Sequence, residues 1–335
     1  MQNRLSETVT AVPIGRLHLQ AGQGALTPEM ADILARMLSV TSKGPDFQTI
    51  PVHEARAHYA HAQSFWNEGS QSLCTVQRLS IPSHSHMIYG VRIDPLPNSL
   101  SLGTILYLHG GGWVFGSTRT HHGAMVQLCL ATGMTVIGID YRLAPEAPFP
   151  AGLDDTFTAW NWMKAQAPVL KLKGPWIIAG DSAGANIALA NLLQLRDRGL
   201  PLSDAALLFY GVYTAEEMSE SHSICGNGRF GLSSERMAWF RRHYLGGTPE
   251  NALSEKVAPL LADLRGLPPL FITAAEFDVL HDDSVELARA AEAADVPTVF
   301  KRYCGVIHGF MQMSRTLPEA KIAIRDAGDF ARKFI

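Results

Sequence analysis

The pentapeptide Gly180-Asp181-Ser182-Ala183-Gly184 constrains this chain more than any other feature of its sequence. An apolar run at 176–179 precedes it and a helical pattern at 185–196 follows it, so the order is strand, G-x-S-x-G, helix. In that order a serine lies on a sharp turn with its Oγ exposed above a sheet. The glycines allow the strained turn, and small neighbours let the strand and the helix approach closely. The pattern indicates a nucleophilic Ser182 rather than an ordinary glycine turn.

Apolar and amphipathic segments alternate from about residue 75 to the end of the chain. Short apolar or β-branched runs predict strands at 75–81, 87–93, 104–109, 134–140, 176–179, 205–210, 270–275 and 298–303. Helical periodicity predicts helices at 121–131, 153–165, 185–196, 281–293 and 319–334. Repeated strand–helix alternation predicts an α/β fold with a mainly parallel sheet and helices on both faces.

Two regions break this alternation. Residues 1–65 have helical patterns without strands, and residues 211–247 form a long insertion between two strands. Long insertions in compact domains are often lids. We therefore expect residues 1–70 to form the N-terminal part of a cap, and residues 71–335 to form the catalytic domain, with 211–247 as a cap insertion. The alternative is that both regions are surface decoration.

Composition and charge exclude several classes of function. The net charge is −3 over 335 residues, so no basic field attracts nucleic acid or anionic lipid. No apolar stretch is long enough to span a membrane, and residues 1–16 lack the apolar core of a signal peptide. These features predict a soluble, cytoplasmic protein.

The cysteines point to the same setting. They lie far apart without C-x-x-C spacing, which favours buried free thiols over disulfides or a zinc site. The four are Cys74, Cys129, Cys225 and Cys304. We expect no bound metal.

A serine nucleophile needs a base, usually a histidine held by a carboxylate. In the strand–G-x-S-x-G–helix setting these partners follow in the order Ser, Asp or Glu, His. Asp278 follows the strand at 270–275, and His308 follows the strand at 298–303, so order and placement both fit. Loop position and order distinguish His308 from the other histidines among the 13 in the chain.

The acid is less certain than the base by spacing alone. Glu276, Asp282 and Asp283 all lie close to Asp278 in the sequence. Asp278 itself could simply begin the helix that follows it, because acidic residues are favoured there.

A second motif, His109-Gly110-Gly111-Gly112-Trp113, follows the strand at 104–109. Acyl transfer develops negative charge on a carbonyl oxygen, and backbone N–H groups stabilise that charge only where the main chain comes close. Consecutive glycines permit this approach. Gly111 and Gly112, with the N–H of Ala183, would form an oxyanion hole. The alternatives are a flexible glycine loop or a phosphate loop, and the latter lacks G-x-x-x-x-G-K-[ST].

Five motifs in order make the chain resemble the hormone-sensitive-lipase family of α/β-hydrolases, and within it the bacterial acetyl esterases. The motifs are HGGGW at 109–113, YRLAPEAPFPAGLDD at 141–155, GDSAG at 180–184, AEFDVLHDD at 275–283 and HGF at 308–310. LLFYGVYTAEE at 207–217 and EFDVLHDDS at 276–284 carry the closer likeness. The resemblance covers about residue 102 to the end of the chain.

The resemblance implies an α/β-hydrolase fold with a mostly parallel central sheet, flanking helices and a helical cap. It implies Ser182 as nucleophile, Asp278 as acid and His308 as base, which decides among the neighbouring acids. It maps the oxyanion hole to Gly110, Gly111, Gly112 and Ala183. It implies a serine carboxylesterase that acts on small-molecule esters of short acids, acetyl to butyryl, through an acyl-enzyme and without a cofactor.

Several expectations remain open at this stage. Trp113, Tyr213 and Phe310 are candidates for apolar walls of the substrate pocket, or else ordinary core aromatics. The same triad would serve an amidase, a lactonase or a formamidase, and a binding or regulatory protein on a hydrolase scaffold is a further alternative. The resemblance implies a monomer or a homodimer, and no residue pattern chooses between the two.

Overall fold

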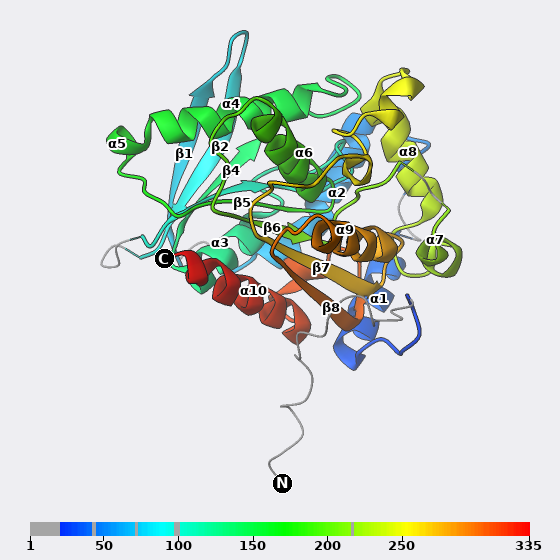
Figure 1. Ribbon diagram of the computed structural model, residues 1–335. Helices are drawn as coiled ribbons and strands as arrows, with labels where there is room; N and C mark the ends of the chain where they lie inside the picture. Colours follow the sequence, from blue (N-terminus) through cyan, green and yellow to red (C-terminus); the bar gives the residue numbers. More distant parts are fainter. Residues whose placement is uncertain (1–20, 42–44, 71–72, 97–100, 216–217) are drawn as a thin grey trace.

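The computed structural model describes residues 21–41, 45–70, 73–96, 101–215 and 218–335. Within these residues an eight-stranded sheet runs through the molecule in the order β1-β2-β4-β3-β5-β6-β7-β8 (Figure 1). The strands are β1 (Thr75–Pro82), β2 (Met87–Asp94), β3 (Thr104–Leu108), β4 (Thr135–Asp140), β5 (Trp176–Asp181), β6 (Ala205–Phe209), β7 (Leu270–Phe277) and β8 (Thr298–Ile307). β2 pairs antiparallel with β1 and β4, and all other neighbours are parallel. The predicted mainly parallel sheet is confirmed.

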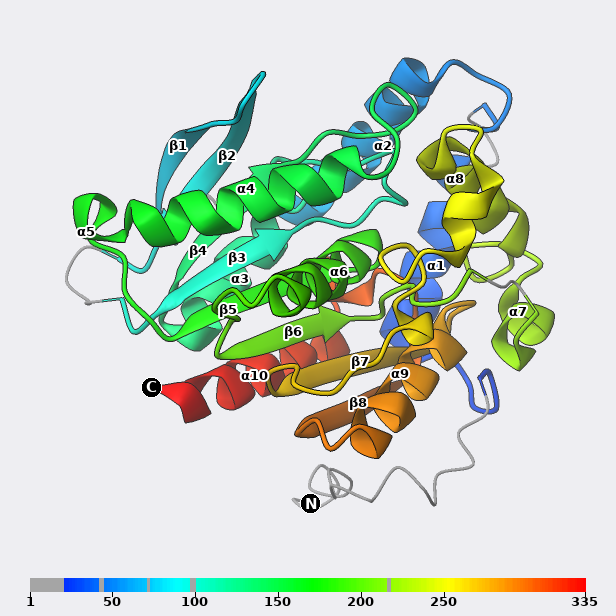
Figure 2. The same ribbon diagram turned by 45° about the horizontal axis from the view of Figure 1, so that its top comes forward.

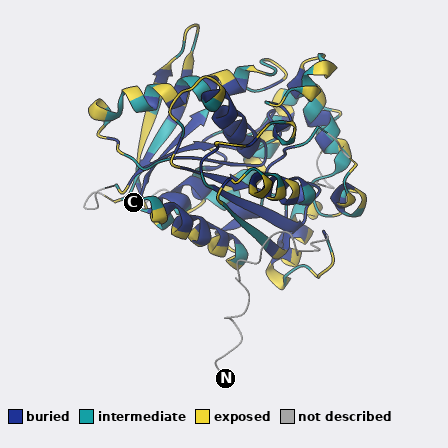
Figure 3. Cartoon of the chain, viewed as in Figure 1, coloured by how far each residue is buried: buried dark blue, intermediate teal, exposed yellow. Residues whose placement is uncertain are grey.

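Helices cover both faces of the sheet, as Figure 2 shows. One layer contains α4 (Ala151–Ala165), α5 (Ala167–Leu170), α6 (Ala183–Asp197) and α9 (His281–Ala293), and the other contains α3 (His122–Thr132) and α10 (Pro318–Ala331). Alternate side chains of a strand point to opposite faces, so each central strand serves two cores. In β3, Leu106 and Leu108 pack in the first core, while Ile105 and Tyr107 pack in the second. This explains why the central strands read as continuous apolar runs and appear uniformly buried in Figure 3.

Four helices lie beyond the carboxyl ends of the parallel strands (Figure 2). They are α1 (Pro28–Thr41), α2 (Val52–Asn67), α7 (Glu220–Cys225) and α8 (Ser234–Leu245). They come from the two regions that break the strand–helix alternation. These regions touch each other, because the Arg236 guanidinium lies 5.0 Å from the Phe47 ring centroid. The part of the expected cap at 1–20 lies outside the described residues.

The cysteines follow the expectation with one exception. Cys74, Cys129 and Cys225 are buried free thiols, whereas Cys304 is exposed. Cys304 lies on the edge strand β8 next to buried Tyr303, so the alternation of side chains turns it outward. The expectation of a buried Cys304 is wrong, because an apolar run does not reveal that its strand lies at the edge of the sheet. Among the described residues, no helix is both long and apolar enough to cross a membrane.

Asp283, in the first turn of α9, anchors the start of the 211–247 insertion to that helix. Its buried Oδ2 accepts hydrogen bonds from the N–H groups of Tyr213 at 2.6 Å and Thr214 at 3.0 Å. Its Oδ1 has no hydrogen-bond partner in the described part of the chain. Burial raises the pKa of the Asp283 carboxyl to about 7, although the two backbone donors lower it. The folded protein therefore holds a proton here that an unfolded chain releases.

We predict that this proton makes stability depend on pH. Because the pKa of Asp283 is raised in the folded state, the stability that this group contributes is fully present below the ordinary pKa of 3.8. This stability is lost as pH rises through about 7. Asp283→Asn keeps an acceptor for Tyr213 and Thr214 and stays neutral. The difference in unfolding free energy between Asp283→Asn and wild type should therefore increase in favour of the variant from pH 3.8 to about 7, by up to about 4 kcal/mol. Above that pH the difference should stay constant.

Urea unfolding at one-unit pH intervals measures this difference. The exposed Glu250, changed to Gln, controls for the loss of one carboxylate. A difference between Asp283→Asn and wild type that stays constant from pH 4 to pH 8 would refute the assignment.

Candidate active site

Ser182 lies on the turn between β5 and α6 in a backbone conformation that side-chain-bearing residues rarely adopt, with φ 52° and ψ −121°. The Ser182 N–H donates to Phe209 O at 2.9 Å, which holds the turn against β6. A Cβ on Gly180 would overlap the backbone of Gly184, and a Cβ on Gly184 would overlap Leu108 O. The strand and helix therefore approach as closely as the sequence predicts, and both glycines are sterically required.

A chain of hydrogen bonds joins Ser182, His308 and Asp278. His308 Nε2 lies 3.0 Å from Ser182 Oγ, and His308 Nδ1 lies 2.7 Å from Asp278 Oδ2. The other Asp278 oxygen accepts the Leu280 N–H at 2.9 Å. Asp278 is 1% exposed, whereas the His308 side chain is 16% exposed. A neutral imidazole in this position can take the hydroxyl proton through Nε2 while the carboxylate holds its other nitrogen.

The neighbouring acids that spacing alone left open have other partners. Glu276 accepts N–H groups of Gly24 and Gly305. Asp282 binds the Ser221 N–H, and Asp283 binds the insertion. Asp278 is the acid in contact with His308.

The glycine loop after β3 presents backbone donors beside Ser182. Gly111 and Gly112 have φ values of 120° and 60°, which glycine adopts freely. In the described part of the chain, the N–H groups of Gly111, Gly112 and Ala183 donate to no protein atom. Ala183 is the first residue of α6, so its N–H also lies at the positive end of a helix. These three donors can stabilise a developing oxyanion.

Gly110 differs from its neighbours. Its N–H donates to Asp181 Oδ1 at 2.9 Å, so it is not free for a substrate oxygen. The sequence interpretation that placed Gly110 among the oxyanion donors is therefore corrected: the sequence does not show that the Asp181 side chain points at this N–H. Gly110 matters sterically, because a Cβ there would lie 2.6 Å from Asp181 Oδ2.

Asp181 is a buried carboxylate that joins the serine turn to the glycine loop. Besides Gly110, it accepts Tyr107 OH at 2.7 Å and Gln312 Nε2 at 3.2 Å, and His121 Nε2 lies 3.5 Å away. Burial opposes the charge, but His121, Tyr107 and the Gly110 N–H outweigh it and hold the pKa of Asp181 below its usual value. Sequence reasoning missed this role, although an acid between two apolar segments is itself a signal of a buried partner.

Arg56 connects α2 to the segment that follows the glycine loop, a role that the sequence interpretation also missed. Its guanidinium donates to Val114 O and Ala144 O, each at 2.8 Å, and pairs with Glu146 at 2.6 Å. Glu146 thus holds Arg56 in place at the surface of α2. Arg142 also pairs with a carboxylate, that of buried Asp155, at 2.8 Å.

The three aromatic candidates for pocket walls are buried. Trp113 stacks on Tyr244 with ring centroids 4.3 Å apart, and Phe310 packs against Tyr210. Tyr213 is fully buried, and its N–H donates to Asp283. Phe240 of α8, which the sequence did not single out, lies directly over the glycine loop, because a Cβ on Gly112 would overlap its ring.

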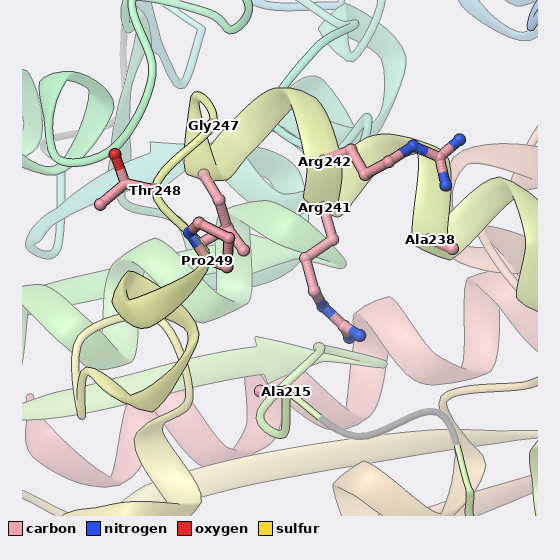
Figure 4. A pocket seen from close by; sticks show the side chains of 8 residues that line it. Ala215, Ala238, Arg241, Arg242, Gly247, Thr248 and Pro249 are labelled. Carbon is pink, nitrogen blue, oxygen red and sulfur yellow. The ribbon is translucent and has the colours of Figure 1, made fainter.

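A pocket of about 540 Å³ lies on another face of α8 (Figure 4). Its lining residues are Ala215, Ala238, Arg241, Arg242, Leu245, Gly247, Thr248 and Pro249. The Arg241 side chain points from α8 toward Ala215, while Arg242 points away from it. None of the candidate catalytic residues lines this pocket, so it is separate from the Ser182 site.

Comparisons with known proteins agree with this geometry. A family model described as alpha/beta hydrolase fold matches residues 105–312. Acetyl esterases of Salmonella dublin and Salmonella enteritidis are 35% identical over 283 residues, 83% of this chain and 86% of theirs. The hyperthermophilic esterase of the archaeon Pyrobaculum calidifontis has a TM-score of 0.87 at 29% identity, covering 92% of this chain and 99% of that one. A thermostable esterase of Pseudomonas putida has a TM-score of 0.85 at 26% identity, covering 92% and 97%.

We predict that Asp181→Ala destabilises the fold by about 2–6 kcal/mol, because it leaves the buried Tyr107 hydroxyl and the Gly110 N–H without their acceptor, at about 1–3 kcal/mol each. Asp181→Asn, which retains an acceptor for Gly110, should lose less. Guanidinium unfolding of both variants measures the difference, with the exposed pair Asp263–Arg265 as control through Asp263→Ala. Equal stability of Asp181→Ala and wild type would show that this network does not hold the loop.

Proposed function

Because this chain belongs to the hormone-sensitive-lipase-like family of α/β-hydrolases and is a serine carboxylesterase, we propose that it hydrolyses esters of short carboxylic acids, acetyl to butyryl. We further propose Ser182, His308 and Asp278 as its catalytic residues. The hydrogen-bonded chain from Ser182 Oγ to Asp278, beside three free backbone N–H groups, is the observation that carries this proposal. The esterase relatives favour ester hydrolysis over the amidase, lactonase, formamidase and non-catalytic alternatives.

In the first step, Ser182 Oγ attacks the carbonyl carbon of the ester and His308 Nε2 takes the hydroxyl proton. Asp278 stabilises the imidazolium that forms and keeps its orientation. The carbonyl oxygen becomes an oxyanion, which accepts the N–H groups of Gly111, Gly112 and Ala183. One such donor typically contributes about 3 kcal/mol of transition-state stabilisation.

In the second half, His308 gives its proton to the departing alcohol and an acyl-enzyme remains on Ser182. Water then attacks the acyl carbon, His308 takes a proton from that water, and the acid leaves as Ser182 regains its hydrogen. The same donors stabilise both oxyanions, so the reaction needs one site for two similar transition states.

The preference for short acids is supported by the ring that covers the glycine loop. Phe240 lies over Gly112 and packs edge-on against Phe115 with centroids 5.3 Å apart. A rigid aromatic wall next to the oxyanion position leaves less room for a long chain than an open groove would. The names of the Salmonella relatives, acetyl esterases, point the same way.

The helices beyond the strand ends are proposed to act as the cap, with residues 1–70 and 211–247 contributing to it. Three contacts support this role: Phe240 over Gly112, Arg56 on Val114 O, and Ser221 Oγ on Val279 O at 2.6 Å. Each contact joins a cap helix to a loop that carries a proposed catalytic group, so the cap would control access to Ser182. The buried unpaired thiols Cys74, Cys129 and Cys225 support a reducing, cytoplasmic setting.

We predict that Ser182→Ala lowers kcat for p-nitrophenyl acetate by about a millionfold, because no other group in the chain of hydrogen bonds can form the acyl-enzyme. Ser203→Ala, a buried serine on another loop, is the matched control and should retain activity. Steady-state kinetics with circular dichroism separates lost chemistry from lost folding. Comparable turnover by folded Ser182→Ala would disprove the nucleophile assignment.

We predict that kcat/KM falls with the length of the acyl chain. p-Nitrophenyl acetate and butyrate should exceed the dodecanoate ester by at least about tenfold, because the wall at Phe240 excludes added methylenes. The measurement is a series of p-nitrophenyl esters at concentrations below micelle formation. Equal kcat/KM across the series would contradict the short-acid preference and leave the esterase activity untouched.

A further inference from the structure

We propose that Glu276 is a positioning residue that fixes the position of the acid Asp278 relative to the base His308. It also binds residues 22–27, here called the N-terminal arm, to the segments that carry both. This proposal rests on the roles assigned above to Asp278 and His308. Glu276 does not contact the reacting atoms. It acts through the backbone of the two strands that end at those residues.

The Glu276 carboxylate uses both oxygens to join two separate segments. Oε1 accepts the Gly24 N–H at 2.8 Å, and Oε2 accepts the Gly305 N–H at 2.8 Å. Arg302 Nη2 lies 3.0 Å from Oε1, and the Glu276 side chain is 4% exposed. A buried carboxylate with a cation and two backbone donors is held in one geometry, because moving it would leave buried groups unpaired.

Glu276 lies where the pairing of β7 and β8 changes register. Ala275 pairs with Tyr303, but the next pair is Phe277 with Ile307. Two steps along β7 therefore correspond to four along β8, and the extra residues of β8 form an irregular segment around Gly305, which has φ 72°. The bond from Gly305 N–H to Glu276 closes this irregular segment.

The pair that follows the irregularity leads directly into the site. Asp278 comes one residue after Phe277, and His308 comes one residue after Ile307. A slip of one residue would turn these side chains to the opposite face of the sheet. By holding Gly305, Glu276 keeps the register in which His308 Nδ1 reaches Asp278 at 2.7 Å.

The N-terminal arm is bound to the same place. The Gly22 N–H donates to Glu276 O at 3.0 Å, and the Thr27 N–H donates to Gly305 O at 3.0 Å. Between them, Gly24 donates to the carboxylate itself. The arm continues into α1, so a helix proposed to belong to the cap is joined to the acid and base strands by this carboxylate together with two backbone hydrogen bonds.

The test is Glu276→Gln with Asp326→Asn as the matched control. Glutamine has the same size but one acceptor oxygen, so either Gly24 or Gly305 would face an amide NH₂ group. Asp326 is likewise a buried carboxylate that pairs with a cation of β8, since Lys301 Nζ lies 2.9 Å away. It also accepts a hydrogen bond from Tyr303 OH at 2.8 Å. The variants thus lose similar ion pairs, and in the described part of the chain Asp326 makes no hydrogen bond to residues 22–27 or to Gly305.

Both variants are assayed with p-nitrophenyl acetate, and the competent sites are counted by end-point titration with a p-nitrophenyl phosphonate. For Glu276→Gln, kcat per titrated site should fall by about 10- to 100-fold with little change in KM, because a small displacement of the base slows chemistry more than binding. Asp326→Asn should keep kcat per titrated site within about twofold of wild type, even where its melting temperature falls.

The outcomes are distinguishable. An unchanged kcat per titrated site in Glu276→Gln, with a loss of melting temperature or of titratable sites alone, would overturn the positioning role. If Glu276→Gln does not fold, Gly24→Ala carries the test, since its Cβ would lie 2.9 Å from Glu276 Oε1; an unchanged kcat per site in that variant would overturn the proposal. A wild-type protein that neither hydrolyses the ester nor reacts with the phosphonate would instead disprove the proposed function.

Discussion

The parallel pairing of β3, β5, β6, β7 and β8 determines where every proposed reactive group lies. Parallel strands end at one edge of a sheet, so the loops that follow them meet there. The glycine loop follows β3, Ser182 follows β5, Asp278 follows β7 and His308 follows β8. Groups that are 126 residues apart in sequence, such as Ser182 and His308, therefore come within hydrogen-bond distance.

Strand ends at one edge of the sheet bring the loops together but do not place their atoms within hydrogen-bond distance. Buried carboxylates hold the loops in that finer position. Asp181 joins the serine turn to the glycine loop, Glu276 joins the strands of the acid and the base, and Asp283 anchors the insertion. Each accepts backbone N–H groups from a segment distant in sequence. Backbone donors lie at defined places along the chain, so such bonds hold a loop more accurately than apolar packing does.

Local sequence was sufficient for the elements and for the order of the motifs. The strands and helices appear near the predicted positions because their apolar periodicities are strong, and the glycines of the serine turn are required by close contacts that the motif already implies. Cys304 and Gly110 show where this reasoning ends. The exposure of Cys304 depends on which strand forms the edge of the sheet, and the occupied N–H of Gly110 depends on the direction of a side chain 71 residues away.

The sequence by itself determined the α/β-hydrolase fold, the family and the chemical class, because the residues that specify these lie in short motifs with a definite order. Tertiary structure alone decided which backbone N–H groups remain free, and that Phe240, Arg56 and Glu276 contact the loops of the site. These relations depend on strand register and on side-chain directions across long separations. Strand register and side-chain direction are not determined by the neighbouring residues along the chain, so these contacts are known only from the folded sheet.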